Sequence, residues 1–151
     1  IYTQRSSHLS THSGEVSFPG GKVEEGDENL FATALRESSE EMNLNGEDIT
    51  VLGKLDYLIS RHKVEVNPFV VTVDSPQPLK PNQEIQEIFT VPLSFLLDLK
   101  NIQRERIERQ GMAWQVPTWN HNNQKIWGLT AIITVNFLNL CLDANIEILE
   151  G

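Results

Sequence analysis

Three glutamates at helical spacing are the residues of this sequence best suited to chemistry. Glu37, Glu40 and Glu41 stand at positions i, i+3 and i+4, which neighbour one another on a helix surface. Arg36 is the only basic residue between positions 24 and 48, a window that holds 9 of the 21 acids. The alternating Lys and Arg residues of an ordinary solvated helix face are therefore missing.

Carboxylates gathered in this way suit a hard divalent cation. Gly20 and Gly21 precede the glutamates, and glycine allows backbone carbonyls to approach a ligand closely. Mg²⁺ is typically held by a few carboxylates together with substrate phosphates, so we predict a Mg²⁺ or Mn²⁺ site that acts on a phosphate ester. A solvated acidic face is the alternative. Without metal, mutual repulsion should raise the pKa of at least one of these carboxyl groups.

The elements that must position these residues follow from the hydrophobic pattern. Residues 15–18 are expected to be extended and to end at the breaker Pro19-Gly20-Gly21. The expected helices span residue 27 or 28 to about 43, residues 92–97 and residues 129–142. The last of them is apolar nearly all round and is expected to be buried. The expected strands span residues 49–59, 64–73, 87–91, 102–109 and 113–119. This order predicts an α/β chain of the α+β type, with a mixed sheet covered by helices.

Size, charge and cysteine content exclude several classes of protein. The chain has 151 residues, which suits one domain over residues 1–151. Lys and Arg number 12 against 21 Asp and Glu, which argues against a nucleic-acid binder or a protein that binds anionic membranes. The single cysteine, Cys141, excludes an intrachain disulfide and a multi-thiolate zinc site. Its apolar surroundings predict a buried thiol.

The sequence contains no obvious targeting or membrane segment. No apolar stretch reaches the ~18 residues of a membrane span, and no signal peptide is visible, so we expect a cytoplasmic protein. The chain begins with Ile1-Tyr2-Thr3, without Met and with the pattern of a strand interior. We therefore expect the natural N-terminus to lie upstream. The run of residues 75–81, rich in Pro, is expected to be a loop.

The glycines, Arg36 and the glutamates together resemble the Nudix box. The matching residues are Gly20, Gly21, Asp27 or Glu28, Arg36, Glu37, Glu40, Glu41 and Leu44. A second, more specific set resembles the coenzyme A pyrophosphatase branch of the Nudix hydrolases. Its upstream residues are Thr3, Arg5, Ser6, Leu9, His12, Gly14, Val16, Phe18 and Pro19. Its downstream residues lie in the runs 33–37, 67–70, 81–84, 91–93 and 126–131.

The sequence departs from the Nudix box and from the branch pattern at four places. Asn43 replaces the usual Gly at the helix end, where Asn still tolerates the left-handed conformation. Ser38 replaces a hydrophobic residue on the packing face. The box is one residue longer than the general pattern, so Asp27 and Glu28 both remain candidates for its first acid. Ser10 stands where the branch often has an Arg, which removes one phosphate contact.

The resemblance implies a fold and an activity. The fold would be an α/β/α sandwich. The activity would be hydrolysis of the pyrophosphate bond of coenzyme A to 4′-phosphopantetheine and adenosine 3′,5′-bisphosphate. Glu37, Glu40 and Glu41 would hold Mg²⁺ or Mn²⁺, together with a backbone carbonyl of Gly20 or Gly21. The alternatives are another substrate, such as ADP-ribose, and a silent Nudix-fold binding module. A homodimer is compatible with the resemblance.

The resemblance also suggests individual roles around this cluster. Arg36 would pair with Asp27 or Glu28 and orient the glutamates. Glu40 or Glu41 is the first choice for the general base, and Glu84 is the second.

Two basic residues upstream are candidates for phosphate binding, and three ring-bearing residues elsewhere are not candidates for the site. Arg5 and His12 would contact a phosphate, with surface solubility or a local turn bond as the alternative for each. His62 is expected on the surface of a hairpin turn and His121 in a turn, while Trp127 is expected to pack before the last helix.

Overall fold

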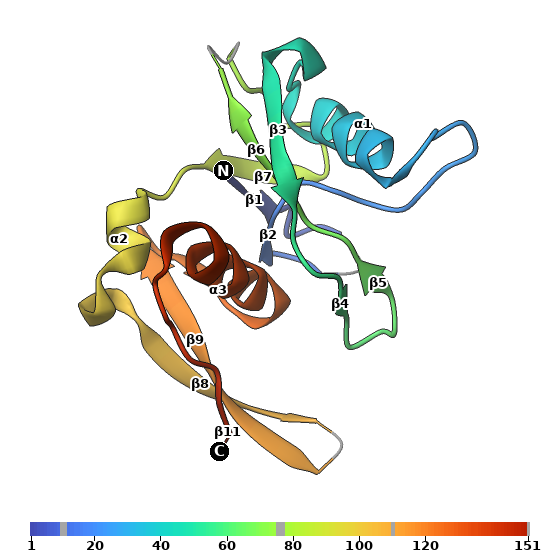
Figure 1. Ribbon diagram of the computed structural model, residues 1–151. Coiled ribbons are helices and arrows are strands. Elements are labelled where there is room, and N and C mark those ends of the chain that lie inside the picture. Colours follow the sequence, from blue (N-terminus) through green and yellow to red (C-terminus); the bar gives the residue numbers. More distant parts are fainter. Residues whose placement is uncertain (10–11, 75–77, 110, 151) are drawn as a thin grey trace. The chain divides into compact units, whose positions relative to one another are not determined.

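The computed structural model (Figure 1) describes residues 1–9, 12–74, 78–109 and 111–150. The chain divides into two units, Ile1–Phe89 and Thr90–Gly151. Ser10 and residues 75–77 of the expected Pro-rich loop lie outside the described residues. The first unit contains all the candidate site residues: the three glutamates, the Gly-Gly pair, Arg5, His12 and Glu84. The expectation that the whole chain is one domain stays a prediction.

Strand β1 (Tyr2–Arg5) is the middle strand of a three-stranded antiparallel sheet in the first unit. β2 (Val16–Ser17) pairs with one edge and β7 (Ile85–Phe89) with the other. The Tyr2 ring stacks on those of Phe18 and Phe89, with centroids 4.7 and 5.6 Å away. The register of β1 with β7 shifts between Gln4 and Arg5. Arg5 therefore stands where the strand passes into the loops of the site.

Two further antiparallel pairs complete the strands of the first unit. β3 (Ile49–Lys54) pairs with β6 (Phe69–Val73), and β4 (Leu58–Ile59) pairs with β5 (Glu65–Val66). The two long strands expected from the sequence are thus each divided in two. Pro68, which has no N–H to donate, lies between β5 and β6.

Helix α1 (Leu30–Met42) begins later than the sequence suggested. Asn29 is the N-cap and its side chain accepts the Ala32 N–H, a favoured capping bond. The helix ends at Asn43, which adopts the left-handed conformation with φ 57°, as predicted. A short 3₁₀ turn, η1 (Gly46–Asp48), follows. The Phe31 ring packs edge-on against Phe69 of β6, with centroids 5.3 Å apart.

The second unit is built on a long hairpin. β8 (Gln103–Arg109) pairs with β9 (Met112–His121), and β10 (Gln124–Ile126) and β11 (Leu149–Glu150) also pair with β9. Before them come α2 (Leu93–Leu97) and the 3₁₀ turn η2 (Leu99–Asn101), and α3 (Gly128–Leu142) packs on β9. Trp119, 1% exposed, anchors this core, and its indole N–H donates to the Leu96 carbonyl at 3.1 Å.

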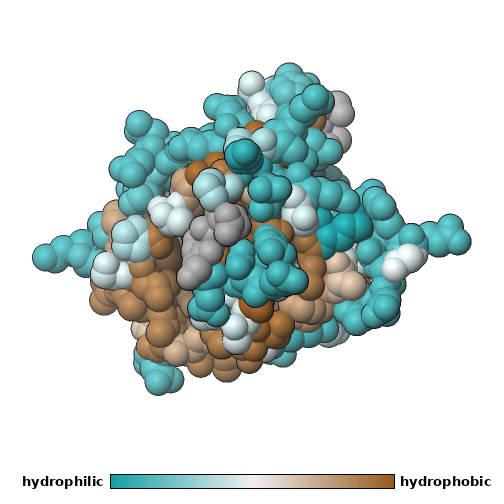
Figure 2. Space-filling view, turned by 90° about the horizontal axis from the view of Figure 1, so that it is seen from above, coloured by the Kyte–Doolittle hydropathy of each residue, from teal (hydrophilic) through white to brown (hydrophobic). Residues whose placement is uncertain are grey.

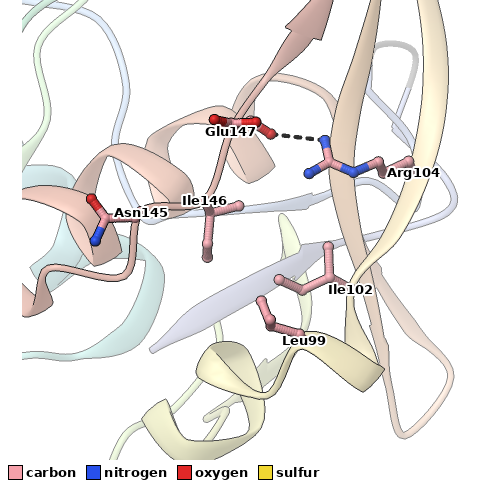
Figure 3. A pocket seen from close by; sticks show the side chains of 6 residues that line it. All are labelled: Leu99, Ile102, Arg104, Asn145, Ile146 and Glu147. Atoms are coloured by element: carbon pink, nitrogen blue, oxygen red, sulfur yellow. Dashed lines mark hydrogen bonds between the residues drawn. The ribbon is translucent and has the colours of Figure 1, made fainter.

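A hollow of about 300 Å³ lies in this second unit (Figure 3). Its lining consists of Leu99, Ile102, Arg104, Asn145, Ile146 and Glu147. Arg104 Nη1 donates to the carbonyls of Glu147 and Gln115, at 2.8 and 3.3 Å. The arginine thereby ties the C-terminal segment to β9.

Four expectations for the C-terminal part are wrong. α3 is not buried all round: Leu140 is 70% exposed and Cys141 is exposed as well, because only one side of the helix meets the core. Trp127 is 36% exposed, with the Lys125 ammonium 5.7 Å from its ring. His121 is the last residue of β9 and its ring lies 4.8 Å from Phe95. The turn is formed by residues 122 and 123 instead.

The α+β class predicted from the sequence is confirmed. The sheet differs in detail, because every strand pairing in the described ranges is antiparallel and the strands form four separate sheets. The connections of the pairs β4–β5, β8–β9 and β9–β10 are short, which favours antiparallel pairing. Across those ranges no helix is both long and apolar enough to span a membrane. The face drawn in Figure 2 mixes hydrophilic residues with exposed apolar ones.

Candidate active site

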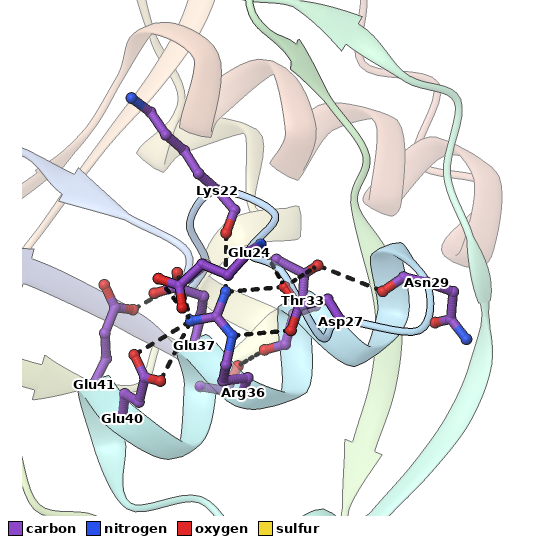
Figure 4. A network of polar contacts seen from close by, with 12 residues as sticks. Lys22, Glu24, Asp27, Asn29, Thr33, Arg36, Glu37, Glu40 and Glu41 are labelled. Atoms are coloured by element: carbon purple, nitrogen blue, oxygen red, sulfur yellow. Dashed lines mark hydrogen bonds and ion pairs between the residues drawn. The ribbon is translucent and has the colours of Figure 1, made fainter.

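Arg36 is the centre of a network of polar contacts on α1 and the loop before it (Figure 4). Its Nε and Nη2 donate to the two carboxylate oxygens of Asp27 at 3.0 and 3.1 Å. Nη2 also donates to the Lys22 carbonyl at 2.9 Å. Nη1 lies 3.1 Å from Glu37 Oε1 and 3.3 Å from Glu40 Oε1. One guanidinium thus joins the loop to two of the three glutamates.

Asp27, rather than Glu28, is the acid that Arg36 holds. Its carboxylate also accepts the Glu24 N–H and the Thr33 hydroxyl, both at 2.9 Å. The hydrogen bond from Arg36, followed by that of the Glu24 N–H, holds the Asp27 pKa well below its usual range. The same pairing raises the pKa of Arg36. Asp27 therefore stays ionised and fixes the loop against the start of the helix, which leaves Asn29 to cap it.

Glu41 is a buried carboxyl on the inner side of α1. It is 5% exposed, and its Oε2 accepts the Gly20 N–H at 3.1 Å. Burial raises its pKa to about 7, and the charges of Glu37 and Glu84 add to the rise. The Gly20 hydrogen bond and the charge of Arg5 oppose it. A raised carboxyl pKa was predicted for the metal-free cluster, but burial is its main cause and repulsion the lesser one.

The two glycines contact the glutamates through their backbone. Gly20 adopts φ 152°, in the region that side-chain-bearing residues rarely enter. It presents its N–H to Glu41, whereas the sequence suggested a carbonyl directed at a metal. At Gly21 an added Cβ would overlap the carboxylate of Glu37. The Gly-Gly pair therefore forms a cradle that any larger residue at position 21 would fill.

Glu84 reaches the same cluster from a loop before β7. Arg5 Nη2 lies 3.8 Å from Glu84 Oε2, and the charges of both residues act on the Glu41 carboxyl. The Arg5 Nε is buried and makes no hydrogen bond. The structure thus brings Arg5 and Glu84 to the helix glutamates, although the sequence places them far apart.

His12 has partners of its own. Its Nδ1 lies 2.8 Å from Glu15 Oε2, and its ring lies 5.4 Å from that of His62. Arg61 also pairs with Glu15, at 3.7 Å. Among the described residues, His12 forms no hydrogen bond or ion pair with the α1 glutamates. Its bond to Glu15 is the local turn bond that the sequence offered as the alternative. His62 is exposed in the turn between β4 and β5, as predicted.

Two residues that the sequence analysis left without a role help to build the site. Asn82 N–H donates to the Glu41 carbonyl at 3.1 Å, and Ser6 Oγ donates to the Gln83 carbonyl at 3.0 Å. The Pro-Asn pair before Glu84 is a turn signal that points to Asn82. Ser6 belongs to the upstream residues that resemble the branch, but no local signal gives its role, because its partner lies 77 residues away.

The donor set suits a hard divalent cation by its chemistry. Glu37, Glu40 and Glu41 offer carboxylate oxygens, the ligands that Mg²⁺ and Mn²⁺ prefer. Within residues that the structure describes, however, no three acidic or His side chains converge as a metal site would need. The contacts explain this, because Arg36 draws Glu37 and Glu40 toward itself.

Comparisons with known proteins identify the domain family and several relatives of this chain. The family model for the NUDIX domain matches residues 1–114. Relatives called "Uncharacterized Nudix hydrolase NudL" in Yersinia pestis (strain Pestoides F) and Yersinia pseudotuberculosis (serotype O:1b, strain IP 31758) are each 40% identical over 134 residues. That match covers 88% of this chain and 67% of each relative.

A solved structure, a Caenorhabditis elegans Ap4A hydrolase binary complex, is also similar. It gives a TM-score of 0.48 at 23% identity, over 57% of this chain and 62% of that one. The domain match and the two relatives decide the family: the chain is a Nudix hydrolase.

Proposed function

We propose that the chain hydrolyses the pyrophosphate bond of coenzyme A and its derivatives. Nudix hydrolases act on pyrophosphate bonds and generally use divalent metal ions. The products would be 4′-phosphopantetheine and adenosine 3′,5′-bisphosphate. The observation that supports hydrolysis is that Glu37 and Glu41 lie against the Gly-Gly pair, with the charge of Glu84 acting on Glu41. The choice of coenzyme A rests on the residues from Thr3 to Gly21, which resemble the coenzyme A pyrophosphatase branch.

The chain's own residues would divide the work as follows. Glu37, Glu40 and Glu41 would hold Mg²⁺ or Mn²⁺, which when bound neutralises phosphate charge and polarises water. Arg36, fixed by Asp27, would orient Glu37 and Glu40. The acidic chain, with a net charge of −9, repels anionic substrates at long range, so local cations must hold the phosphates.

Glu40 or Glu41 remains our first choice for the general base, and Glu84 our second. Glu41 is 5% exposed, whereas the Glu40 side chain is 55% exposed, so Glu41 is the better shielded of the two from bulk water. Glu84, which is half-exposed and faces Arg5, is the loop residue placed to replace it.

Arg5 is our candidate for the 3′-phosphate of coenzyme A, with His12 as a second contact. A guanidinium can bind phosphate through two parallel hydrogen bonds. Loss of such charge-assisted bonds should lower specificity for 3′-dephospho-coenzyme A by about one to two decades. Because Arg5 already faces Glu84, the phosphate would compete with a carboxylate. Arg5→Ala should therefore remove most of the difference between the two substrates.

Product analysis with coenzyme A, ADP-ribose and NADH side by side tests the proposal. Each substrate is assayed with Mg²⁺, with Mn²⁺ and after exhaustive chelation. We expect coenzyme A to be cleaved best and activity to vanish in chelator. Preferential cleavage of ADP-ribose would indicate a Nudix hydrolase with that substrate instead of coenzyme A. No cleavage of any of the three would favour a binding module. Full activity in chelator would contradict the metal assignment.

A homodimer stays a prediction, which light scattering would test.

A further inference from the structure

The loop of residues 80–84 is attached to the end of helix α1. Lys80 N–H donates to the Met42 carbonyl at 2.9 Å, and Asn82 N–H donates to the Glu41 carbonyl at 3.1 Å. Carbonyls in the last turn of a helix have no donor within the helix. The loop therefore satisfies two of these carbonyls. Its backbone is held in place by the helix that carries the glutamates.

Ser6, which follows β1, holds the other side of the same loop. Its hydroxyl donates to the Gln83 carbonyl at 3.0 Å, and its N–H donates to the Glu84 carbonyl at 2.8 Å. Asn82 Oδ1 accepts the Glu84 N–H at 2.9 Å. Ser6 is 7% exposed, so water is poorly placed to replace its hydroxyl. One small residue thus fixes two consecutive carbonyls, the second being that of Glu84.

The residue before Ser6 acts on the side chain of the same acid. Arg5 Nη2 lies 3.8 Å from Glu84 Oε2, while Ser6 holds the Glu84 backbone. The residues at the end of β1 therefore contact both the backbone and the side chain of Glu84. The charge of Glu84 in turn acts on Glu41. This arrangement links a strand, a loop and the helix at one carboxylate.

We propose that Ser6 is a positioning residue of the hydrolytic site and acts through Glu84. This inference rests on the proposed function, because Glu84 matters only if the carboxylate cluster performs hydrolysis. The hydroxyl of Ser6 sets the distance of Glu84 from Arg5 and from the helix glutamates. Ser6 itself touches neither the substrate nor the reacting atoms.

Ser6→Ala removes the hydroxyl and leaves the Gln83 carbonyl without its donor. Small displacements of a working group can reduce the rate by orders of magnitude, so we expect kcat to fall on the order of tenfold. KM for 3′-dephospho-coenzyme A, which lacks the phosphate assigned to Arg5, should stay within about twofold. Ser6→Thr keeps a hydroxyl and should restore most of kcat.

A double-mutant cycle shows whether Ser6 acts through Glu84. If it does, Ser6→Ala combined with Glu84→Gln should be no slower than Glu84→Gln alone. Thr134→Val is the matched control, because Thr134 is also buried and its hydroxyl donates to a backbone carbonyl, that of Thr130, at 2.9 Å. It should leave kcat unchanged. Additive losses in the cycle would overturn the proposal.

Amide hydrogen exchange gives a reading that does not depend on activity. Exchange at residue 6 and at residues 82–85 should be roughly tenfold faster in Ser6→Ala and near wild type in Ser6→Thr. If exchange at these amides were unchanged in Ser6→Ala, the proposal that the Ser6 hydroxyl holds the loop would be overturned. A wild-type protein that cleaves no diphosphate would instead overturn the proposed function, and the exchange rates would show separately whether Ser6 holds the loop.

Discussion

Helices α1 and α3 have similar lengths but bury polar and apolar residues in different proportions. Three of the four buried residues of α1 are polar (Thr33, Ser38 and Glu41), whereas four of the five in α3 are apolar, Val135 and Leu138 among them. Buried polar groups need partners to offset their lost hydration; Ser38 finds one in the Ala34 carbonyl, at 2.7 Å. Apolar groups need only close packing. Helix α3 therefore builds a core, whereas α1 buries groups such as Glu41 that oppose folding, as expected of a helix that carries the proposed site.

The placement of charge in α1 strengthens this difference. The three glutamates lie in the C-terminal half of the helix, where the helix dipole disfavours negative charge. No basic residue occupies the last turn of α1, and Arg36 supplies the nearby compensation. Both helices nevertheless end in the same manner, with left-handed residues at Asn43 and Asp143. The helices therefore differ in what they bury rather than in how they end.

The largest stability effect should come from the apolar helix. Leu138 is fully buried, and Leu138→Ala should lower the free energy of unfolding by about 2–5 kcal/mol. Urea denaturation measures this change. Under conditions where the variant is folded, its kcat should match the wild type. A loss of under about 1 kcal/mol would mean that α3 does not carry the core of its unit.

The largest effect on catalysis should come from the acidic helix. Glu41→Gln keeps the size of the side chain and removes its negative charge, so kcat should fall by roughly 10²-fold or more. Glu40→Gln should also lose more rate than substrate binding. Glu28→Gln is the matched control, since Glu28 is an exposed acid just before α1, and it should retain activity. If Glu84→Gln were the most damaging change, the base would lie on the loop and not on the helix.

The metal-free protein should lose stability as Glu41 ionises. Its pKa is raised from 4.5 to about 7, so between these pH values the folded state holds a proton that the unfolded state releases. The free energy of unfolding should therefore fall as pH rises through this window. We expect a change on the order of 1–2 kcal/mol, relative to Glu41→Gln in chelator.

Denaturation of both proteins from pH 4 to pH 8 measures this difference. Contributions to the free energy of unfolding that wild type and Glu41→Gln share, such as that of Asp27, cancel in the difference. Asp27 has a lowered pKa, so its stabilisation is lost only in acid, as pH falls. Parallel curves for wild type and Glu41→Gln would show that Glu41 is not the group that titrates.

The smallest effect should come from the exposed end of α3. Leu140 is 70% exposed, and Leu140→Ala should change the free energy of unfolding by no more than about 0.5 kcal/mol. The comparison with Leu138→Ala, two residues away, separates the two sides of the helix. A loss as large as that of Leu138→Ala would show that Leu140 is covered in solution.

Local patterns predicted the elements of this chain better than their contacts. The left-handed end of α1 at Asn43 and the acid cluster follow from residue type and spacing. The pattern could not choose between Asp27 and Glu28, because both precede the helix and only the folded loop brings Asp27 to Arg36. It also missed the polar burial of α1, since Ser38 and Glu41 are satisfied by partners that spacing does not reveal.

Contacts between distant segments account for most of the rest. The bond between Ser6 and Gln83 spans 77 residues, and no local rule predicts it. The apolar run of α3 predicted a helix but not which side meets the core, so Cys141 was expected to be buried. His121 was expected in a turn because three Asn residues surround it, whereas β9 continues through His121.

Equilibrium binding of Mn²⁺ shows most directly whether the α1 glutamates hold a metal ion. Equilibrium titration of the metal-free protein with Mn²⁺, followed by electron paramagnetic resonance, would be compared for wild type, Glu41→Gln and Glu28→Gln. We predict that wild type and Glu28→Gln bind Mn²⁺ alike, and that Glu41→Gln binds at least roughly tenfold more weakly. Equal Mn²⁺ affinity in all three proteins, or no binding by wild type, would contradict a metal site on the α1 glutamates.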